Sequence, residues 1–174
     1  MNARRILIVV LLSILLLSCG SSAYHEVPKA ICGTPIDPAL TRLLVKSAKE
    51  FHEYNRVDRS DAITAPCILL AEHDPVLEFR FSWDDTATDL MYLATGSGSV
   101  SRVTQPRSIN LGYKSIVGTD GAISIDRCAT KGGKYFTLTL QVPQIGLMDQ
   151  THRKDIEKFM RAYFPATLKT LGCK

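Results

Sequence analysis

The chain has 174 residues, of which 45% are hydrophobic and 22% are charged, a balance typical of a globular protein. Its 21 Lys and Arg residues exceed its 17 Asp and Glu residues by four, and the two kinds are mixed along most of the sequence. Because nucleic-acid-binding proteins usually concentrate Lys and Arg on one face, this distribution argues against a nucleic acid partner.

The first predicted element is a signal peptide. Arg4 and Arg5 precede an uncharged apolar run from Ile6 to Leu17. A transmembrane helix needs roughly 20 apolar residues, so this run is too short to remain as a permanent anchor. We therefore expect residues 1–18 to be removed.

The sequence Leu16-Leu17-Ser18-Cys19 resembles the lipobox of bacterial lipoproteins, in which a small residue stands directly before a cysteine. In that family the cysteine receives a diacylglyceryl group, and the chain is cut in front of it. The resemblance implies a palmitate-type lipid anchor on Cys19 at the extracytoplasmic face of the cell membrane. Small residues at Ser21-Ser22-Ala23 offer an alternative, cleavage after Ala23, which would release a secreted protein.

The chain after the signal peptide is long enough for one domain. We expect residues 19–29 to form a flexible tether and residues 30–174 to form a single domain. Four cysteines remain for this domain, which in an exported chain is typical of two disulfides. None stands in a close CxxC pair of the kind that zinc and redox sites use. The four are Cys32, Cys67, Cys128 and Cys173.

Four cysteines allow three pairings, and the sequence alone does not choose among them. Pairing Cys32 with Cys67 and Cys128 with Cys173 closes the shorter loops and fixes both ends of the domain. We adopt this pairing as a hypothesis, with a contribution of about 3–4 kcal/mol from each bridge.

The sequence pattern in the first half of the domain predicts one short helix, a strand and a hairpin. Asp37 before Pro38 is typical of a helix start, and this helix should reach about Leu44. Residues 49–57 predict a strand. The run from Cys67 to Glu72 and the alternating run from Val76 to Trp83 predict two antiparallel strands joined by a turn.

Asp84 and Asp85 predict the cap of a second helix that continues to about Ala94. Beyond the glycine and serine cluster at 96–99, which we interpret as a loop, two further runs predict a hairpin around Asp120-Gly121. These runs are 113–117 and 122–128. Residues 135–142 alternate apolar and polar side chains and predict another strand.

The last predicted helix runs from about Gln150 to Tyr163, and Pro165 should end or kink it. Its polar face carries basic side chains that could address anionic lipid headgroups. The acids Asp155 and Glu157 interrupt that face, which favours an ordinary solvated surface. The basic residues are Arg153, Lys154, Lys158 and Arg161.

These elements predict an α+β fold with an antiparallel sheet of five or six strands, two to three helices packed on one face, and two disulfides. The segment VPKAICGTPIDPAL, Cys128 at a strand end and the final LGC together resemble a group of small lipoproteins exported by actinobacteria. That group has no assigned activity. The resemblance implies a lipid anchor, disulfides and a compact domain, and it assigns no catalytic residue.

The sequence predicts no catalytic, cofactor-binding or metal-binding residue. Its four histidines are scattered, and no nucleophile elbow is present. We therefore predict a non-catalytic binding module at the cell envelope that holds a small apolar ligand or a protein partner. The alternative is an envelope enzyme that uses the acidic residues near Asp84 and Asp85, although their place at a helix start favours a capping role.

Overall fold

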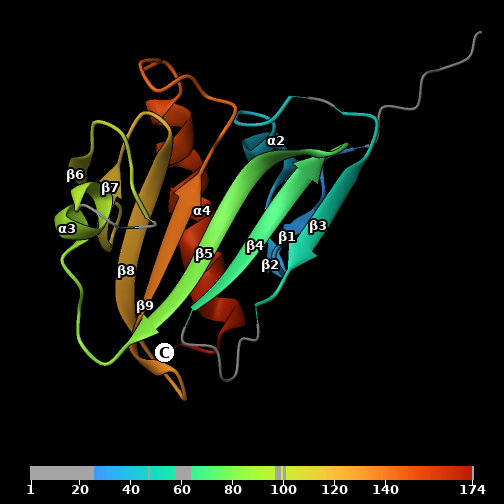
Figure 1. Cartoon of the computed structure of the whole chain (residues 1–174). Helices are drawn as coiled ribbons and strands as arrows, with labels where there is room; N and C mark the ends of the chain where they lie inside the picture. The colour runs from blue at the N-terminus through green and yellow to red at the C-terminus, as the bar shows by residue number, and fades with distance from the viewer. Residues whose placement is uncertain (1–25, 47, 58–63, 97–98, 100, 174) are drawn as a thin grey trace, which may run out of the picture.

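Figure 1 shows a computed structural model of the chain, which describes residues 26–46, 48–57, 64–96, 99 and 101–173. The predicted signal peptide, Cys19 and most of the predicted tether lie outside these residues. Seven strands form one antiparallel sheet in the order β3-β4-β5-β9-β8-β7-β6. Their bounds are β3 Phe51–Asn55, β4 Thr64–Ala71, β5 Asp74–Asp84, β6 Arg107–Asn110, β7 Lys114–Val117, β8 Gly121–Thr130 and β9 Gly133–Gln141.

One face of this sheet carries the larger core. The long helix α4 (Arg153–Thr170) crosses this face (Figure 1). The short helix α2 (Pro38–Thr41) contacts α4. The small hairpin of β1 (Ala30–Ile31) and β2 (Thr34–Pro35) also lies against α4. Alternate residues of the central strands point into this layer, because side chains along a strand alternate between faces. The largest buried side chains of this core are Phe81, Trp83 and Phe136 from the strands and Phe159, Tyr163 and Phe164 from α4.

The opposite face carries a second and smaller core under helix α3 (Leu90–Thr95). In β7, Val117 belongs to the larger core and Ile116 to the smaller one. In β8, Ala122 and Ile123 divide in the same way. Helices α3 and α4 therefore lie on opposite sides of the same strands.

Both disulfides of the proposed pairing are present and both lie in the α4 layer. Cys32 is bonded to Cys67, which joins the chain beside β1 to β4. Cys128 is bonded to Cys173, which joins β8 to the chain just after α4. The predicted pairing is confirmed.

The predicted α+β class is confirmed, and the sheet has one strand more than the upper prediction. Strand β6 was missed, because its four residues show no clear alternation and gain their order by pairing with β7. Two helices share one face as predicted, while α3 takes the other.

Three predicted helix bounds were wrong, and the first is the end of α2, which lies at Thr41 and not near Leu44. Asp84 does not cap a helix, because it is the last residue of β5 and pairs with Tyr135; the cap of α3 is Asp89. Pro165 lies inside α4 and does not end it. Phe164 and Thr167 on either side of Pro165 are fully buried, so packing holds the helix together where local preference would break it.

Candidate functional site

The candidate site is a groove beside α3, on the sheet face that α4 does not cover. Asp89 positions the helix, since its carboxylate accepts hydrogen bonds from the backbone N–H groups of Met91 (2.8 Å) and Tyr92 (3.2 Å). Leu90 and Ala94 then face the smaller core. A helix of only six residues covers little of the sheet, which leaves the neighbouring surface open.

The groove is an open cleft of about 470 Å³ between the start of α3 and strands β6, β7 and β8. Its apolar lining comes mainly from Leu90, Met91, Ile116 and Ile125. Met91 is 40% exposed, so the helix presents an accessible thioether at this opening. The remaining lining residues are Ala87, Thr88, Asp89, Ser108, Ile109, Lys114 and Ser115.

Five of the eleven lining residues of the groove are polar or charged, and three of these, Asp89, Ser108 and Lys114, are exposed. Lys114 at the start of β7 and Ser108 in β6 are exposed and lie on the α3 side of the sheet by register. Lys114 forms no ion pair with a carboxylate in the described part of the chain, whereas the Asp89 carboxylate is held by the helix cap. The groove therefore combines an apolar lining with one available cation, an arrangement suited to an amphiphilic ligand with an anionic group.

A second recess of about 540 Å³ adjoins the groove at the turn between β6 and β7. Gly112 at this turn has φ +95°, a conformation that favours glycine, and its N–H donates to the Asn110 side chain (2.8 Å). Tyr113 donates its hydroxyl proton to the Met160 carbonyl in α4 (2.6 Å). Burial raises the pKa of Tyr113, while Arg161 opposes that rise, so the phenol stays protonated at neutral pH.

The aspartates of the enzyme hypothesis lie elsewhere. Asp84 and Asp85 are exposed at the end of β5, and neither lines either of these two clefts. Of the acidic residues in this segment, only Asp89, the cap of α3, reaches the groove. None of the lining residues of the groove is a histidine or cysteine, and Ser115 hydrogen-bonds to Ser124 (2.8 Å between hydroxyls). The geometry thus offers binding contacts and no nucleophile paired with a base.

Among the described residues, one set of three potential metal ligands comes together: Cys32, Glu53 and Cys67. The two sulfurs are bonded to each other, so neither is the thiolate that a metal requires. The Glu53 carboxylate accepts a hydrogen bond from the Cys32 backbone N–H. This set is a structural link between β3 and the β1–β2 hairpin.

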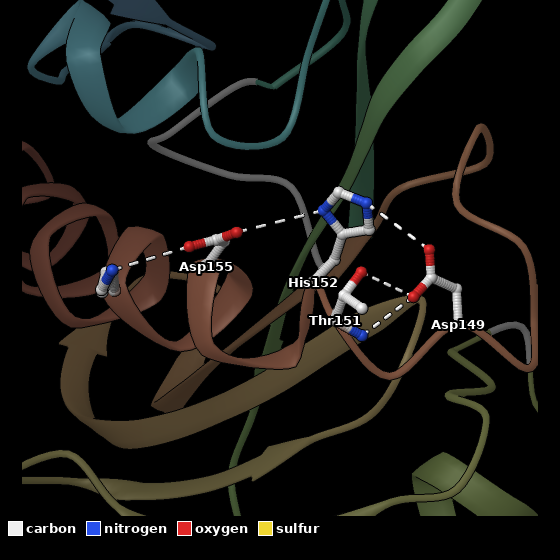
Figure 2. Close-up of polar contacts among 5 residues, drawn as sticks. Asp149, Thr151, His152 and Asp155 are labelled. Atoms are coloured by element: carbon white, nitrogen blue, oxygen red, sulfur yellow. Dashed lines mark hydrogen bonds and ion pairs between the residues drawn. The ribbon is translucent and has the colours of Figure 1, made fainter.

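A polar cluster precedes α4 (Figure 2). His152 lies between two carboxylates, with its Nε2 3.7 Å from Asp149 and its Nδ1 4.0 Å from Asp155. Thr151 donates two hydrogen bonds to Asp149, from its hydroxyl (2.6 Å) and its backbone N–H (2.9 Å). The pKa of Asp149 is lowered mainly by the hydrogen bond from the Thr151 hydroxyl and next by the one from the Thr151 backbone. Burial raises this pKa, and the charge of His152 lowers it further. These contacts organise the chain where α4 begins.

The chain matches no family model, no curated protein and no solved structure. No helix in the described part of the chain is long and apolar enough to cross a membrane.

The groove was not among the features that the sequence predicted. Ser108 and Lys114 line it because β6 pairs with β7, and β6 was not predicted. The alternation of Lys114 and Ile116 within a predicted strand was the available signal that both share one face of the sheet. That signal did not reveal that a short helix from residues 90–95 would cover only part of this face.

Proposed function

We propose that the protein is a lipid-anchored, non-catalytic binding module of the bacterial cell envelope, which holds a small amphiphilic ligand in the groove beside α3. The groove carries this proposal, because it joins Leu90, Met91, Ile116 and Ile125 to a single cation at Lys114. An apolar wall of this kind favours burial of a hydrocarbon or ring, and the ammonium group favours a carboxylate, sulfonate or phosphate at the rim.

The lipid anchor rests on the lipobox-like sequence that ends at Cys19 and on the resemblance to actinobacterial lipoproteins. Two disulfides support an exported location, since such bonds persist in oxidising compartments. Intact mass spectrometry of the protein from a bacterial membrane tests this part. A mass that starts at Cys19 and includes a diacylglyceryl group supports the anchor, and a mass that starts at Tyr24 without lipid overturns it.

Ligand binding is testable with 1-anilinonaphthalene-8-sulfonate, a fluorescent probe that has an apolar ring system and a sulfonate. We expect saturable binding that weakens when Lys114→Gln removes the cation and is blocked when Ser108→Phe fills the rim. Arg127→Gln and Thr64→Phe are matched controls, because they make the same changes at exposed positions outside the groove. Equal binding by all four variants would overturn the groove as the binding site.

A protein partner is the second candidate. Met91 and Tyr92 on α3 are 40% and 67% exposed, an unusual exposure for large apolar side chains beside a groove. Tyr92→Ser would weaken such a complex while leaving the binding of the naphthalene probe intact, since Tyr92 does not line the groove.

A further inference from the structure

The solvent side of α4 carries a basic ridge, formed by Lys154, Lys158, Arg161 and Lys169. All four are exposed, and their spacing places them on one side of the helix. This side lies opposite the buried stripe that includes Phe159 and Tyr163. From Lys154 to Lys169 the ridge extends about 22 Å along the helix axis.

The two acids that interrupt this face in the sequence do not lie on the ridge itself. Helical spacing puts Asp155 on one flank and Glu157 on the other, with side chains 27% and 30% exposed. Asp155 pairs with Lys158 (3.6 Å) and Glu157 with Arg161 (2.9 Å). These cations remain well exposed in spite of the pairing, at 63% and 53%, so their charges still face solvent.

Lys154 and Lys169, at the two ends of the ridge, have no carboxylate partner among the residues that the structure describes. Further cations, Arg42 and Lys46, are exposed next to the start of α4, where they line a small cleft together with His152. The outermost part of the α4 layer is therefore cationic at both ends of the helix and along its first half, with the exposed Pro165 between Arg161 and Lys169.

The N-terminal chain joins the fold in this same layer. Tyr163 of α4 donates a hydrogen bond to the Ile31 carbonyl in β1 (2.9 Å), and the hydroxyls of Thr34 and Thr167 lie 3.1 Å apart. Cys19 lies seven positions before Glu26, the first described residue, and seven Cα–Cα steps span at most about 25 Å. Because the chain enters the fold beside α4 and this reach is short, a lipid on Cys19 would hold the α4 layer close to the bilayer.

We infer that the basic ridge of α4 docks on anionic phospholipid headgroups of the membrane that anchors Cys19. The inference rests on the proposed lipid anchor. Because α3 and its groove lie on the opposite face of the sheet, docking through α4 points the groove away from the bilayer. The module then takes its ligand from the envelope side and does not extract it from the membrane on which it sits.

The test uses the lipidated protein, purified from membranes and reconstituted into vesicles of phosphatidylcholine with or without phosphatidylglycerol. Lysines are acetylated with the neutral reagent N-hydroxysuccinimidyl acetate and quantified by peptide mass spectrometry. We expect phosphatidylglycerol to slow the labelling of Lys158 by about five-fold or more, because one cation near an anionic surface gains about 1 kcal/mol. The labelling rate of Lys114 in the groove should not change. High salt should remove the protection.

Two variants with the same loss of charge locate the effect, and Lys158 serves as the reporter in both. The triple change Lys154→Gln, Arg161→Gln and Lys169→Gln should restore the labelling rate seen on phosphatidylcholine. The triple change Arg56→Gln, Arg102→Gln and Arg127→Gln removes three exposed cations outside α4 and should leave the protection intact. All six positions are exposed, and unchanged thermal unfolding confirms that each variant folds.

Equal labelling of Lys158 on both kinds of vesicle overturns the inference, as does equal loss of protection in both triple variants. Protection of Lys114 in place of Lys158 also overturns it, because the groove would then face the bilayer. Failure of the anchor is a separate result, seen in the intact mass before reconstitution. A chain without lipid is then tested by co-sedimentation with the same vesicles at low and high salt. Salt-sensitive binding that the triple change on α4 abolishes supports docking, and no binding overturns it.

Discussion

The two faces of the sheet differ in how thickly they are covered. The α4 face is sealed by an 18-residue helix, two disulfides and stacked aromatic rings, including Phe79 with Tyr163 at 4.8 Å between centroids. The α3 face has a helix of six residues over a small aliphatic core, and the groove lies beside it. The thicker layer supplies most of the buried apolar area, which leaves the thinner layer free to present a binding surface.

In this small domain the α4 layer provides most of the stability, and the α3 face provides the proposed binding surface. A rigid layer tolerates few changes, because close-packed aromatic cores have little space for relaxation. A short helix held by one cap and a few aliphatic contacts can shift or open at much lower free energy. Three substitutions, in Phe159, Leu90 and Asp149, should measure this contrast, and their effects on stability should decrease in that order.

Phe159→Ala should lower the free energy of unfolding by about 3–5 kcal/mol, because a fully buried ring that packs on Phe79 and Tyr163 leaves a cavity. Urea denaturation measures this loss. Binding of the naphthalene probe by the folded protein should not change, since Phe159 lies on the opposite face from the groove. If Phe159→Ala lowered the free energy of unfolding no more than Leu90→Ala in the smaller core, the two faces would not differ in stability.

Leu90→Ala should cost about 2 kcal/mol, near the lower end for such a change, because Leu90 is 8% exposed and the surrounding core is small. The effect should concentrate on α3. Hydrogen exchange should speed up at the Leu93 amide, which bonds to the Asp89 carbonyl, and probe binding should weaken. If hydrogen exchange speeded up equally at amides throughout α4, the two layers would open together and would not differ in local stability.

Asp149→Asn should give the smallest effect, and one that depends on pH. Hydrogen bonds from Thr151, above all the one from its hydroxyl, lower the pKa of Asp149 in the folded state. The ionised carboxylate therefore contributes stability at neutral pH that is lost as the pH falls through the lowered pKa. The variant should melt at a lower temperature than the natural protein near pH 7 and at the same temperature in acid.

Thermal melts across this pH range measure the difference between the two proteins. Asp85→Asn is the matched control, since Asp85 is exposed and the structure gives it no hydrogen bond. A constant gap between Asp149→Asn and the natural protein at every pH would assign the effect to packing and not to charge.

Much of the sheet was predictable from particular residues. The alternation from Leu77 to Trp83 identified β5, and Asp120-Gly121 placed the turn between β7 and β8. The disulfide hypothesis was correct because the shorter loops are those that adjacent elements close. Local patterns suffice where a strand has one apolar face or a turn needs a special residue.

The groove was not predictable in the same way. It requires β6, which exists through its pairing with β7, and a helix that begins at Leu90 because Asp89 and not Asp84 caps it. Several residues of 84–95 have suitable capping side chains, so local chemistry permits more than one start. The continuation of β5 to Asp84, paired with Tyr135 across the sheet, removes Asp84 from these candidates.

The α+β class, the main hairpins and the amphipathic character of α4 follow from the sequence alone, because each depends on residues close together in the chain. Only the tertiary structure decided which face α3 covers, where the groove opens and that α4 continues through Pro165. It also placed Asp155 and Glu157 on the flanks of the basic ridge. These features depend on contacts between distant segments, whose packing energy outweighs local preference.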